Sequence, residues 1–193
     1  MRKLVRAALL SVTAALFGAL ALAGPAQAEQ EAKVPGKLVN LGAKLKSGEL
    51  SASAVLGPFV FSNIASGGCL DQDYSDGTPH TAVTAWTCNG GANQQWNLDV
   101  RESDYSVVLT NAASGHCLDQ DFTDGVPHTN LLAWPCNGND NQRWWLYEDA
   151  DGSIFVVNFA TEYVLDQDYT DGVPHNRVTV WPYNGGLNQR WWF

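Results

Sequence analysis

The sequence predicts an all-β domain built from three copies of one four-stranded unit, because a long phrase recurs three times. The copies begin CLDQDYSDGTPH at Cys69, CLDQDFTDGVPH at Cys117 and VLDQDYTDGVPH at Val164. Equivalent residues are separated by 48 and then by 47 positions. A fixed period of this kind is the sequence signature of a repeat architecture. A site that one copy builds should therefore occur up to three times.

Each copy contains four β-prone segments separated by turn residues. An apolar opening segment leads through a polar turn into a Leu-Asp-Gln segment, and an Asp-Gly pair then marks a second turn. A third segment ends at a tryptophan, an Asn-Gly turn follows, and a Gln-x-Trp segment closes the copy. Strands in this number, with few helices, suit a closed β-trefoil, since an open solenoid would need terminal caps that the sequence lacks.

The chain before the repeats has two different compositions. Residues 1–28 combine a basic start, an apolar run and the small-x-small sequence Ala26-Gln27-Ala28, as in a cleaved secretory signal peptide. Residues 29–57 contain no Trp, Tyr or Cys and are interpreted as a linker or spacer. The trefoil is expected over 58–193, with repeats of about 58–104, 105–151 and 152–193. We therefore expect a secreted, extracellular protein.

The expected domain is strongly acidic. The formal net charge of the chain is −9, and it becomes −12 when the three basic residues of the signal peptide are removed. Residues 58–193 contain 17 acidic residues, 4 arginines and no lysine. Such a surface repels phosphate backbones and anionic head groups, so nucleic acid and membrane lipid are not expected partners. A neutral or cationic ligand is favoured.

The four cysteines follow the repeat. Two cysteines stand 19 residues apart in the first copy and 19 apart in the second, while the third copy has Val164 and Tyr183 at both equivalent positions. Cysteines that disappear together are expected to bond within their own repeat. The predicted disulfides are therefore Cys69–Cys88 and Cys117–Cys136. Each closes a loop worth about 3 kcal/mol in the chain-entropy model.

The repeated motifs resemble those of the ricin-type β-trefoil lectin family. The hallmark is a Gln-x-Trp near the end of each repeat, with Cys-x-Asp and Trp-x-Cys-Asn upstream. The Gln-x-Trp recurs in all three copies and the two cysteine motifs in the first two, and the match covers about 136 residues in register. The resemblance implies that the tryptophans of the three Gln-x-Trp motifs pack in the core near a pseudo-threefold axis. These core tryptophans are Trp96, Trp144 and Trp191.

The resemblance also implies one shallow sugar pocket in each repeat. An aspartate accepts hydrogen bonds from sugar hydroxyls, an aromatic ring stacks on the sugar, an asparagine bonds a hydroxyl, and a glutamine orients the aspartate. The residues in these roles are Asp71, Trp86, Asn93 and Gln94 in the first repeat, Asp119, Trp134, Asn141 and Gln142 in the second, and Asp166, Trp181, Asn188 and Gln189 in the third. We expect a glycan or polysaccharide partner, with the third pocket looser because its disulfide is missing.

Two features depart from the family pattern. The position two residues before the stacking tryptophan is Leu132 in the second copy and threonine in the others, which predicts a change of specificity there. The Asp-x-Asp-aromatic run followed by Pro-His is also unusual, and the identity of the sugar stays open. The run has a faint likeness to a calcium loop, but it lacks the ligand spacing and the closing glutamate. We expect no cofactor, with calcium as an accessory alternative.

Other functional classes fit the sequence less well. A glycosidase needs two carboxylates across a cleft, and three identical active sites of that kind in one small trefoil would be unusual. No nucleophile-elbow serine is present, and the cysteines are expected to be paired. We therefore expect no enzymatic activity. The alternative is a protein-binding trefoil, either a protease inhibitor or the receptor-binding subunit of a toxin with a separate partner chain.

Overall fold

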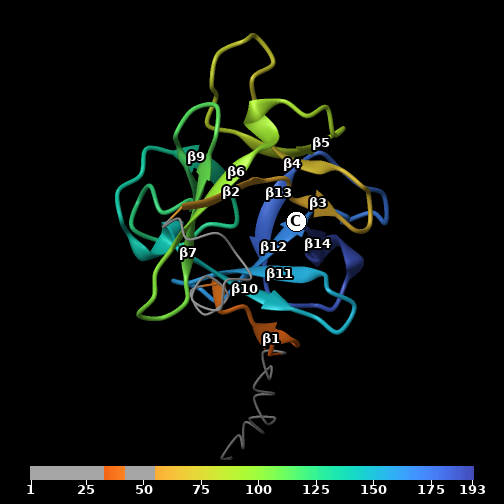
Figure 1. The fold of residues 1–193 in the computed structure, drawn as a ribbon. Coiled ribbons are helices and arrows are strands. Elements are labelled where there is room, and N and C mark those ends of the chain that lie inside the picture. The colour runs from red at the N-terminus through yellow and green to blue at the C-terminus, as the bar shows by residue number, and fades with distance from the viewer. Residues whose placement is uncertain (1–32, 42–54) are drawn as a thin grey trace, which may run out of the picture. The chain divides into compact units, whose positions relative to one another are not determined.

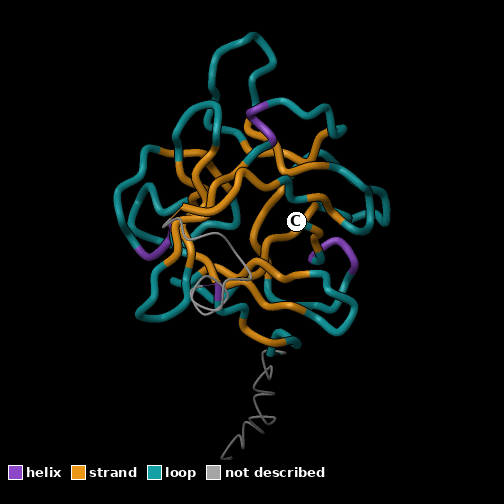
Figure 2. Tube along the Cα trace, viewed as in Figure 1, coloured by secondary structure: helices purple, strands orange, loops and turns teal. Residues whose placement is uncertain are grey.

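The structure, a computed structural model, describes residues 33–41 and 55–193, all of which belong to one compact unit. The expected signal peptide and much of the expected linker lie outside the described residues. Strands and loops make up nearly all of the described chain, and the three helical segments are single 3₁₀ turns (Figure 2). No helix within these residues has the length and apolar character needed to cross a membrane.

The strands form one antiparallel network. They are β1 (Lys37–Leu38), β2 (Val55–Phe59), β3 (Ser62–Asn63), β4 (Cys69–Gln72), β5 (Val83–Trp86), β6 (Trp96–Val100), β7 (Val107–Asn111), β8 (Cys117–Gln120), β9 (Leu131–Trp134), β10 (Trp144–Glu148), β11 (Ile154–Asn158), β12 (Val164–Gln167), β13 (Val178–Trp181) and β14 (Trp191–Trp192). The 3₁₀ turns are η1 (Ala92–Gln94), η2 (Asp140–Gln142) and η3 (Leu187–Gln189).

Seven strands of this network form a closed barrel, in which β2 and β3 together take one of six strand places. Strand β2 pairs with β6, and the pairing continues through β7, β10, β11 and β14 to β3 (Figure 1). The first copy's opening segment is thus divided, since β2 pairs with β6 and β3 pairs with β14. Within β2 the register shifts between Leu56 and Phe59, next to Pro58, which has no N–H for a ladder hydrogen bond. Closure leaves the barrel without a free edge.

Three hairpins, β4–β5, β8–β9 and β12–β13, cap this barrel and contact one another in a threefold pattern. The N–H of Ala85 donates to the Asn176 carbonyl of the third repeat at 2.7 Å. The equivalent bonds run from Ala133 to Thr81 and from Val180 to Thr129, both at 2.8 Å. This arrangement is the β-trefoil, and it confirms the expected fold class.

The three Gln-x-Trp tryptophans form the centre of the core, as the sequence predicts. Trp96, Trp144 and Trp191 are fully buried among leucine, valine and isoleucine side chains of the barrel. Each indole Nε1 donates to the carbonyl of a cap-hairpin leucine, at distances of 3.0 to 3.1 Å. The acceptor is always the residue just before the repeated aspartate: Leu70, Leu118 or Leu165. The indole therefore joins the barrel to the cap.

The N-terminal segment differs from the spacer interpretation where the structure describes it. Strand β1 pairs with β10, and the Val39 N–H donates to the Leu146 carbonyl at 2.8 Å. Val39 and Leu41 are buried in the core cluster. Strand β2 begins at Val55, three residues before the expected boundary of the trefoil. The sequence does not indicate these contacts, because a few apolar side chains among glycines and lysines give no strand periodicity.

Both predicted disulfides are confirmed. Cys69 is bonded to Cys88, and Cys117 is bonded to Cys136. Each bond joins the first residue of a cap strand to the loop after the partner strand. In the third repeat Val164 is buried at the equivalent strand position, and Tyr183 lies against the neighbouring apolar cluster.

The indole hydrogen bonds predict a measurable loss of stability. Trp144→Phe removes the donor and leaves the buried Leu118 carbonyl without its partner, which should lower the free energy of unfolding by about 1–3 kcal/mol. Denaturant titration would measure this change. Trp134→Phe, at an exposed tryptophan, is the matched control and should change the free energy of unfolding by less than about 0.5 kcal/mol. Equal losses in the two variants would contradict the proposed role of the bond.

Candidate functional site

Each repeat gathers one aspartate, one tryptophan and one asparagine around the same cavity. The aspartate lies in the first strand of the cap hairpin, the tryptophan ends the second strand, and the asparagine is the middle residue of the 3₁₀ turn. In the first hairpin Asp71 is paired with Thr84, and Trp86 follows two residues later, so Asp71 and Trp86 share one face. We call the cavities the first, second and third pockets, after Asp71, Asp119 and Asp166.

The pockets differ in size but share their lining. Their volumes are about 590, 270 and 270 Å³ for the first, second and third pockets. The repeated aspartate, tryptophan and asparagine line all three. The tryptophans present exposed rings, with 52%, 43% and 51% of Trp86, Trp134 and Trp181 accessible. A large ring exposed at the same place in three repeats offers flat apolar area to a ligand.

The pocket aspartates are buried and held by amide donors. In the first pocket Asn93 Nδ2 donates to Asp71 Oδ1 at 3.0 Å, and Gln94 Nε2 donates to Oδ2 at 2.8 Å. In the second pocket the corresponding bonds to Asp119 measure 2.9 and 2.7 Å. Each carboxylate is thus fixed in orientation before any ligand arrives.

The third pocket keeps only half of this arrangement. Asn188 Nδ2 donates to Asp166 Oδ1 at 2.9 Å, but Asp166 Oδ2 is buried without a hydrogen-bond partner among the described residues. Gln189 Nε2 donates to the Pro182 carbonyl at 3.0 Å, and the Gln189 amide also lowers the pKa of Asp166. The Asp166 carboxylate therefore has a hydrogen bond from an amide donor on only one of its two oxygens.

Burial raises the pKa of all three pocket aspartates. The pKa of Asp119 and that of Asp166 rise to about 6, and the pKa of Asp71 rises as well. Burial disfavours the charged carboxylate, while the neighbouring glutamine and asparagine amides oppose the shift. The second aspartate of each Asp-x-Asp run adds a smaller repulsion that also raises the pKa.

The glutamines lie behind the pockets and do not line them. Gln94 is fully buried, its Nε2 also donates to the Thr87 carbonyl at 2.9 Å, and its Oε1 accepts from the Asn89 N–H at 2.8 Å. Gln142 and Gln189 make the same bridge in their repeats. The glutamine therefore fixes the loop between the tryptophan and the 3₁₀ turn, and in the first two repeats it also orients the aspartate.

Further lining residues lie outside the predicted set. An aromatic ring follows each Asp-x-Asp run, and an asparagine begins each Asn-Gly or equivalent turn. These residues are Tyr74, Phe122 and Tyr169, with Asn89, Asn137 and Asn184. Their signal was visible in the sequence, since they recur in all three copies. Leu132 does line the second pocket, where the others have threonine.

The second aspartates and the histidines shape the loops. Asp73 Oδ1 accepts from the Ser75 N–H at 2.8 Å, which is a local turn bond. His80 Nε2 lies 2.9 Å from Asp76 Oδ1, and the pairs Asp124–His128 and Asp171–His175 repeat this spacing. Within the part of the chain that the structure describes, no three or more His, Cys, Asp or Glu side chains gather closely enough to hold a metal ion.

Each pocket depends on the next repeat around the ring. The buried Asn111 of the second repeat donates from Nδ2 to the Asn93 carbonyl of the first pocket at 2.8 Å. Asn158 donates to Asn141 at 2.9 Å, and Asn63 donates to Asn188 at 2.8 Å. The 3₁₀ turn that carries each pocket asparagine is therefore held by an asparagine from a different repeat.

This cross-repeat bond predicts where local stability is lost. Asn111→Ala should speed hydrogen exchange of the backbone amides in 92–94 of the first repeat more than in 140–142 of its own repeat. The reason is that the lost side-chain donor holds the 92–94 turn. Hydrogen-exchange mass spectrometry would measure both segments. Asn158→Ala is the matched variant and should act on 140–142 instead. Faster exchange confined to the mutated residue's own repeat would contradict the stabilising role of these cross-repeat asparagine bonds.

Comparison with known proteins assigns the fold and the family. The structure resembles a designed threefold-symmetric protein, ThreeFoil, with 27% identity and a TM-score of 0.61 over 72% of this chain and 96% of that one. It resembles a Macrolepiota procera ricin B-like lectin, solved in complex with lactose, with 24% identity and a TM-score of 0.56 over 70% and 92%.

An exo-β-1,3-galactanase from Clostridium thermocellum also matches, with 27% identity and a TM-score of 0.59, over 74% of this chain but only 30% of the enzyme. A search of curated proteins found no match. The family model of the ricin-type β-trefoil lectin domain matches residues 58–191, which is more than half of the chain. The chain therefore belongs to the ricin-type β-trefoil lectin domain family.

Proposed function

We propose that the protein is a secreted carbohydrate-binding lectin with three weak pockets, one in each repeat. The observation that carries the proposal is the threefold recurrence of an oriented aspartate, an exposed tryptophan and an asparagine around one cavity. Membership of the ricin-type lectin domain family supports the same ligand class. The ligand is a glycan or polysaccharide, and the protein has no enzymatic activity of its own.

The geometry suits a pyranose ring. A sugar presents hydroxyls in a fixed arrangement and one face of C–H groups. The Asp71 carboxyl group offers hydrogen-bond acceptors, which are stronger when it is ionised, and the exposed face of Trp86 offers a stacking surface. The same pair occurs as Asp119 with Trp134 and as Asp166 with Trp181. An open pocket that takes one small polar ligand gains little net free energy, so each site binds weakly.

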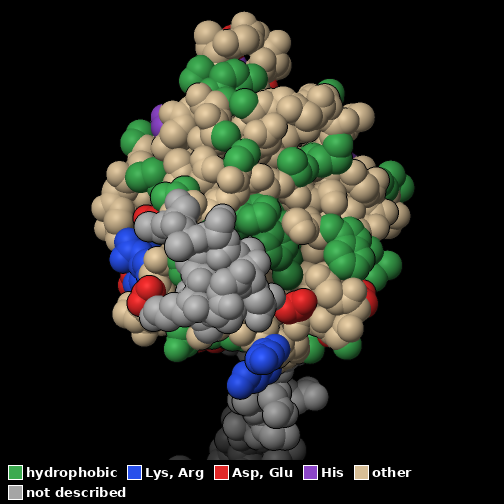
Figure 3. Space-filling model, in the orientation of Figure 1, with side chains coloured by type: hydrophobic (Ala, Val, Ile, Leu, Met, Phe, Trp, Pro, Cys, Tyr) green, Lys and Arg blue, Asp and Glu red, His purple; other side chains and the backbone are tan. Residues whose placement is uncertain are grey.

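Three weak sites gain strength on a repeating ligand. Binding at one pocket raises the effective concentration of neighbouring sugars at the others when the spacing of the glycan fits. The face in Figure 3 carries few charged side chains and scattered hydrophobic ones, which suits a neutral polymer. The biological target is thus a polysaccharide or a glycan-coated surface, not a single free sugar.

The alternative function is a protein-binding trefoil, either a protease inhibitor or the receptor-binding subunit of a toxin with a separate partner chain. Such a protein would need no recurrence of Asp, Trp and Asn at its binding surface. A glycan-array screen with calcium and again with a chelator distinguishes these cases. Binding to one sugar class that survives chelation supports the lectin and a metal-free site. Loss on chelation would assign calcium to the pockets, and no binding by folded protein would favour the alternative.

Combined substitution of the pocket aspartates tests the site. The variant with Asp71→Asn, Asp119→Asn and Asp166→Asn should reduce retention on the selected glycan at least about tenfold, because each pocket loses a charged acceptor. Affinity chromatography would measure retention and thermal unfolding would check the fold. The side-chain amide of each introduced asparagine faces the asparagine and glutamine amides that donate to the aspartate. This substitution therefore also changes the hydrogen bonds behind the pocket, and a second variant is needed.

That second variant changes only exposed rings. Trp86→Ala, Trp134→Ala and Trp181→Ala together should lower retention by a similar factor while leaving the core intact. Trp192→Ala, at an exposed tryptophan that lines none of the three pockets, is the control and should keep full retention. Full retention by both combined variants would refute the assignment of the sites.

The raised aspartate pKa values predict a pH dependence with a definite sign. A ligand hydroxyl donates to the carboxylate, so protonation of Asp119 and Asp166 below about pH 6 removes the acceptor. Affinity at these pockets should fall by about tenfold between pH 7 and pH 5. Isothermal titration at several pH values would measure it. An affinity that stays constant over this range would mean that the carboxylates do not contact the ligand.

The same groups act on stability in the opposite direction. Because their pKa is higher in the folded than in the unfolded chain, the folded state binds more protons between about pH 4 and 6, and their contribution to stability falls as the pH rises through this window. Acidification from pH 7 to 5 should therefore weaken ligand binding without loss of stability from these carboxyl groups. Asp76 and Asp104 have a pKa lowered to about 2, so their stabilising contribution is lost only at more acidic pH.

A further inference from the structure

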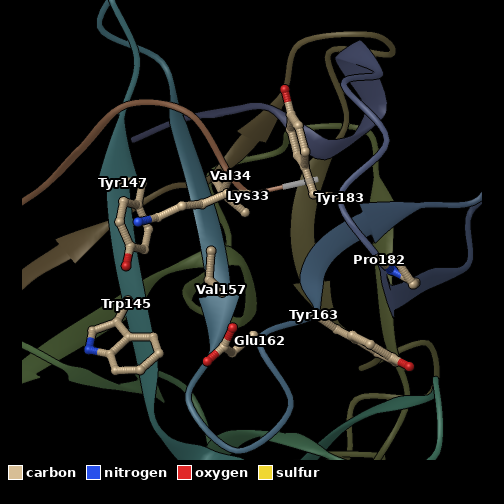
Figure 4. Close-up of a pocket in the computed structure, with 9 residues that line it drawn as sticks. All are labelled: Lys33, Val34, Trp145, Tyr147, Val157, Glu162, Tyr163, Pro182 and Tyr183. Carbon is tan, nitrogen blue, oxygen red and sulfur yellow. The ribbon is translucent and has the colours of Figure 1, made fainter. Parts of the chain in front are cut away.

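A fourth cavity, of about 300 Å³, lies on the outer face of the β10–β11 hairpin (Figure 4). None of its lining residues lines the first, second or third pocket. Trp145 and Tyr147 form one side, Tyr183 stands on the other, and Val157 lies between them; Tyr163 also lines the cavity, with its ring directed away from Val157. We call this cavity the β10–β11 pocket.

The aromatic side comes from strand β10. Buried and partly exposed residues alternate along β10, so Trp145 and Tyr147 face away from the core that contains Trp144. The equivalent strand β6 also begins at a core tryptophan, but it has Asn97 and Asp99 at the corresponding outward positions. The outer face of this hairpin is thus aromatic where its counterpart is polar.

The other side comes from a turn that is specific to the third repeat. Glu162 adopts a left-handed backbone with φ of 61°, where the other two copies have Gly67 and Gly115 with φ of 72° and 73°. A residue with a side chain is strained in this conformation, whereas glycine is not. The third repeat therefore accepts backbone strain at a position where its two sister repeats avoid it. Such strain is typical of functional sites.

The same corner has also lost its disulfide. In the first repeat Cys88 Sγ lies 3.4 Å from the Gly67 carbonyl, so the crosslink packs against the glycine turn. In the third repeat Tyr183 stands in place of the cysteine, and it lines the β10–β11 pocket together with Glu162. Where the first two repeats have a disulfide, the third repeat has an open cavity with aromatic walls.

The rings are held in place without a ligand. Trp145 Nε1 donates to the Asp104 carbonyl at 3.2 Å, and its ring lies 4.5 Å from the ring of Phe159. Tyr183 contacts Phe155 edge to face at 5.4 Å between ring centroids. A cavity whose walls are already fixed loses less conformational entropy when a ligand binds.

The polar groups of the pocket indicate an uncharged, hydroxylated ligand. Glu162 and Lys33 bring one charge of each sign to the lining, so a charged ligand meets one repulsive group. Burial, and after it the Glu162 charge, raises the pKa of Tyr147, which keeps this hydroxyl a donor at neutral pH. Aromatic walls with a few polar donors and acceptors are the usual lining of a small-ligand site.

We propose that the β10–β11 pocket binds one pyranose ring of a neutral saccharide, as a fourth site independent of the three pockets of the repeats. The walls formed by Trp145 and Tyr183 contact the C–H face of the ring, and the Glu162 carboxylate accepts from a hydroxyl. This inference rests on the proposed function, because it assigns the same ligand class. It adds a contact point on the side of the domain that carries β1 and the β10–β11 hairpin.

The tryptophan indole signals in a proton–nitrogen correlation spectrum separate the fourth site from the other three. Trp86, Trp134 and Trp181 report on the first three pockets, Trp145 reports on the β10–β11 pocket, and single Trp→Phe variants assign the signals. The probes are methyl β-galactoside, methyl α-mannoside and xylobiose at millimolar concentration. We expect one of them to shift the Trp145 signal in the wild-type chain and in the variant that carries Asn at the three pocket aspartates.

Glu162→Gly is the decisive substitution, because it restores the residue of the other two repeats. It should leave the fold stable while weakening the response of the Trp145 signal to the probe by about tenfold. Trp192→Phe, at an exposed ring that does not line the β10–β11 pocket, is the matched control and should leave that response unchanged. An unchanged response in Glu162→Gly would overturn the role of the carboxylate.

The fourth site and the proposed function can fail separately. If the Trp86, Trp134 or Trp181 signals shift and the Trp145 signal does not, the fourth site is overturned and the lectin function stands. If all pocket signals are silent with these probes and with the glycans of the array, the proposed function fails and the fourth site fails with it. A Trp145 shift that disappears in the combined aspartate variant would also overturn independence.

Discussion

The hydrogen bond from each buried indole to a cap-hairpin carbonyl ties the core of this protein to its surface pockets. Trp96 Nε1 donates to the Leu70 carbonyl, and the next residue in the chain is the pocket aspartate Asp71. The strand that carries the carboxylate therefore cannot shift without losing a buried bond, which is costly in the interior. Because the same bond recurs in the other repeats, packing and site geometry are set together.

The repeats are also interlocked, so no pocket belongs to one repeat alone. Asparagine side chains already join each repeat to the next. In addition, Ser114 Oγ of the second repeat donates to Gln72 Oε1 of the first at 2.6 Å, and Gln72 Nε2 donates to the His80 carbonyl at 2.8 Å. Equivalent contacts join the other repeats. A short four-stranded unit cannot bury its own apolar face, and closure of three units solves this problem while holding each pocket loop from both sides.

Most of this arrangement could be predicted from the sequence because it is repeated three times. The period predicted the trefoil, and the paired absence of cysteines in the third copy predicted both disulfides. The resemblance to the ricin-type lectin family predicted that the Gln-x-Trp tryptophans lie in the core. The aspartate, tryptophan and asparagine of each repeat indeed meet at one cavity. The period cannot predict structural features that occur only once in the chain. Strand β1, the divided β2 and β3, and the burial of Val39 and Leu41 depend on tertiary contacts of a segment with no repeated partner.

The third repeat carries the most specific information about this chain. Where all three copies agree, a residue can serve the fold, the shared pocket or both. Where the third copy alone differs, at Glu162, Tyr163 and Tyr183, the trefoil does not require the change, since two sister repeats fold with glycine, glycine or histidine, and cysteine. A disulfide that stabilises by constraining the unfolded chain has been given up there. The residues that stand there line one aromatic cavity, so the differences of the third repeat lie together at the proposed fourth site.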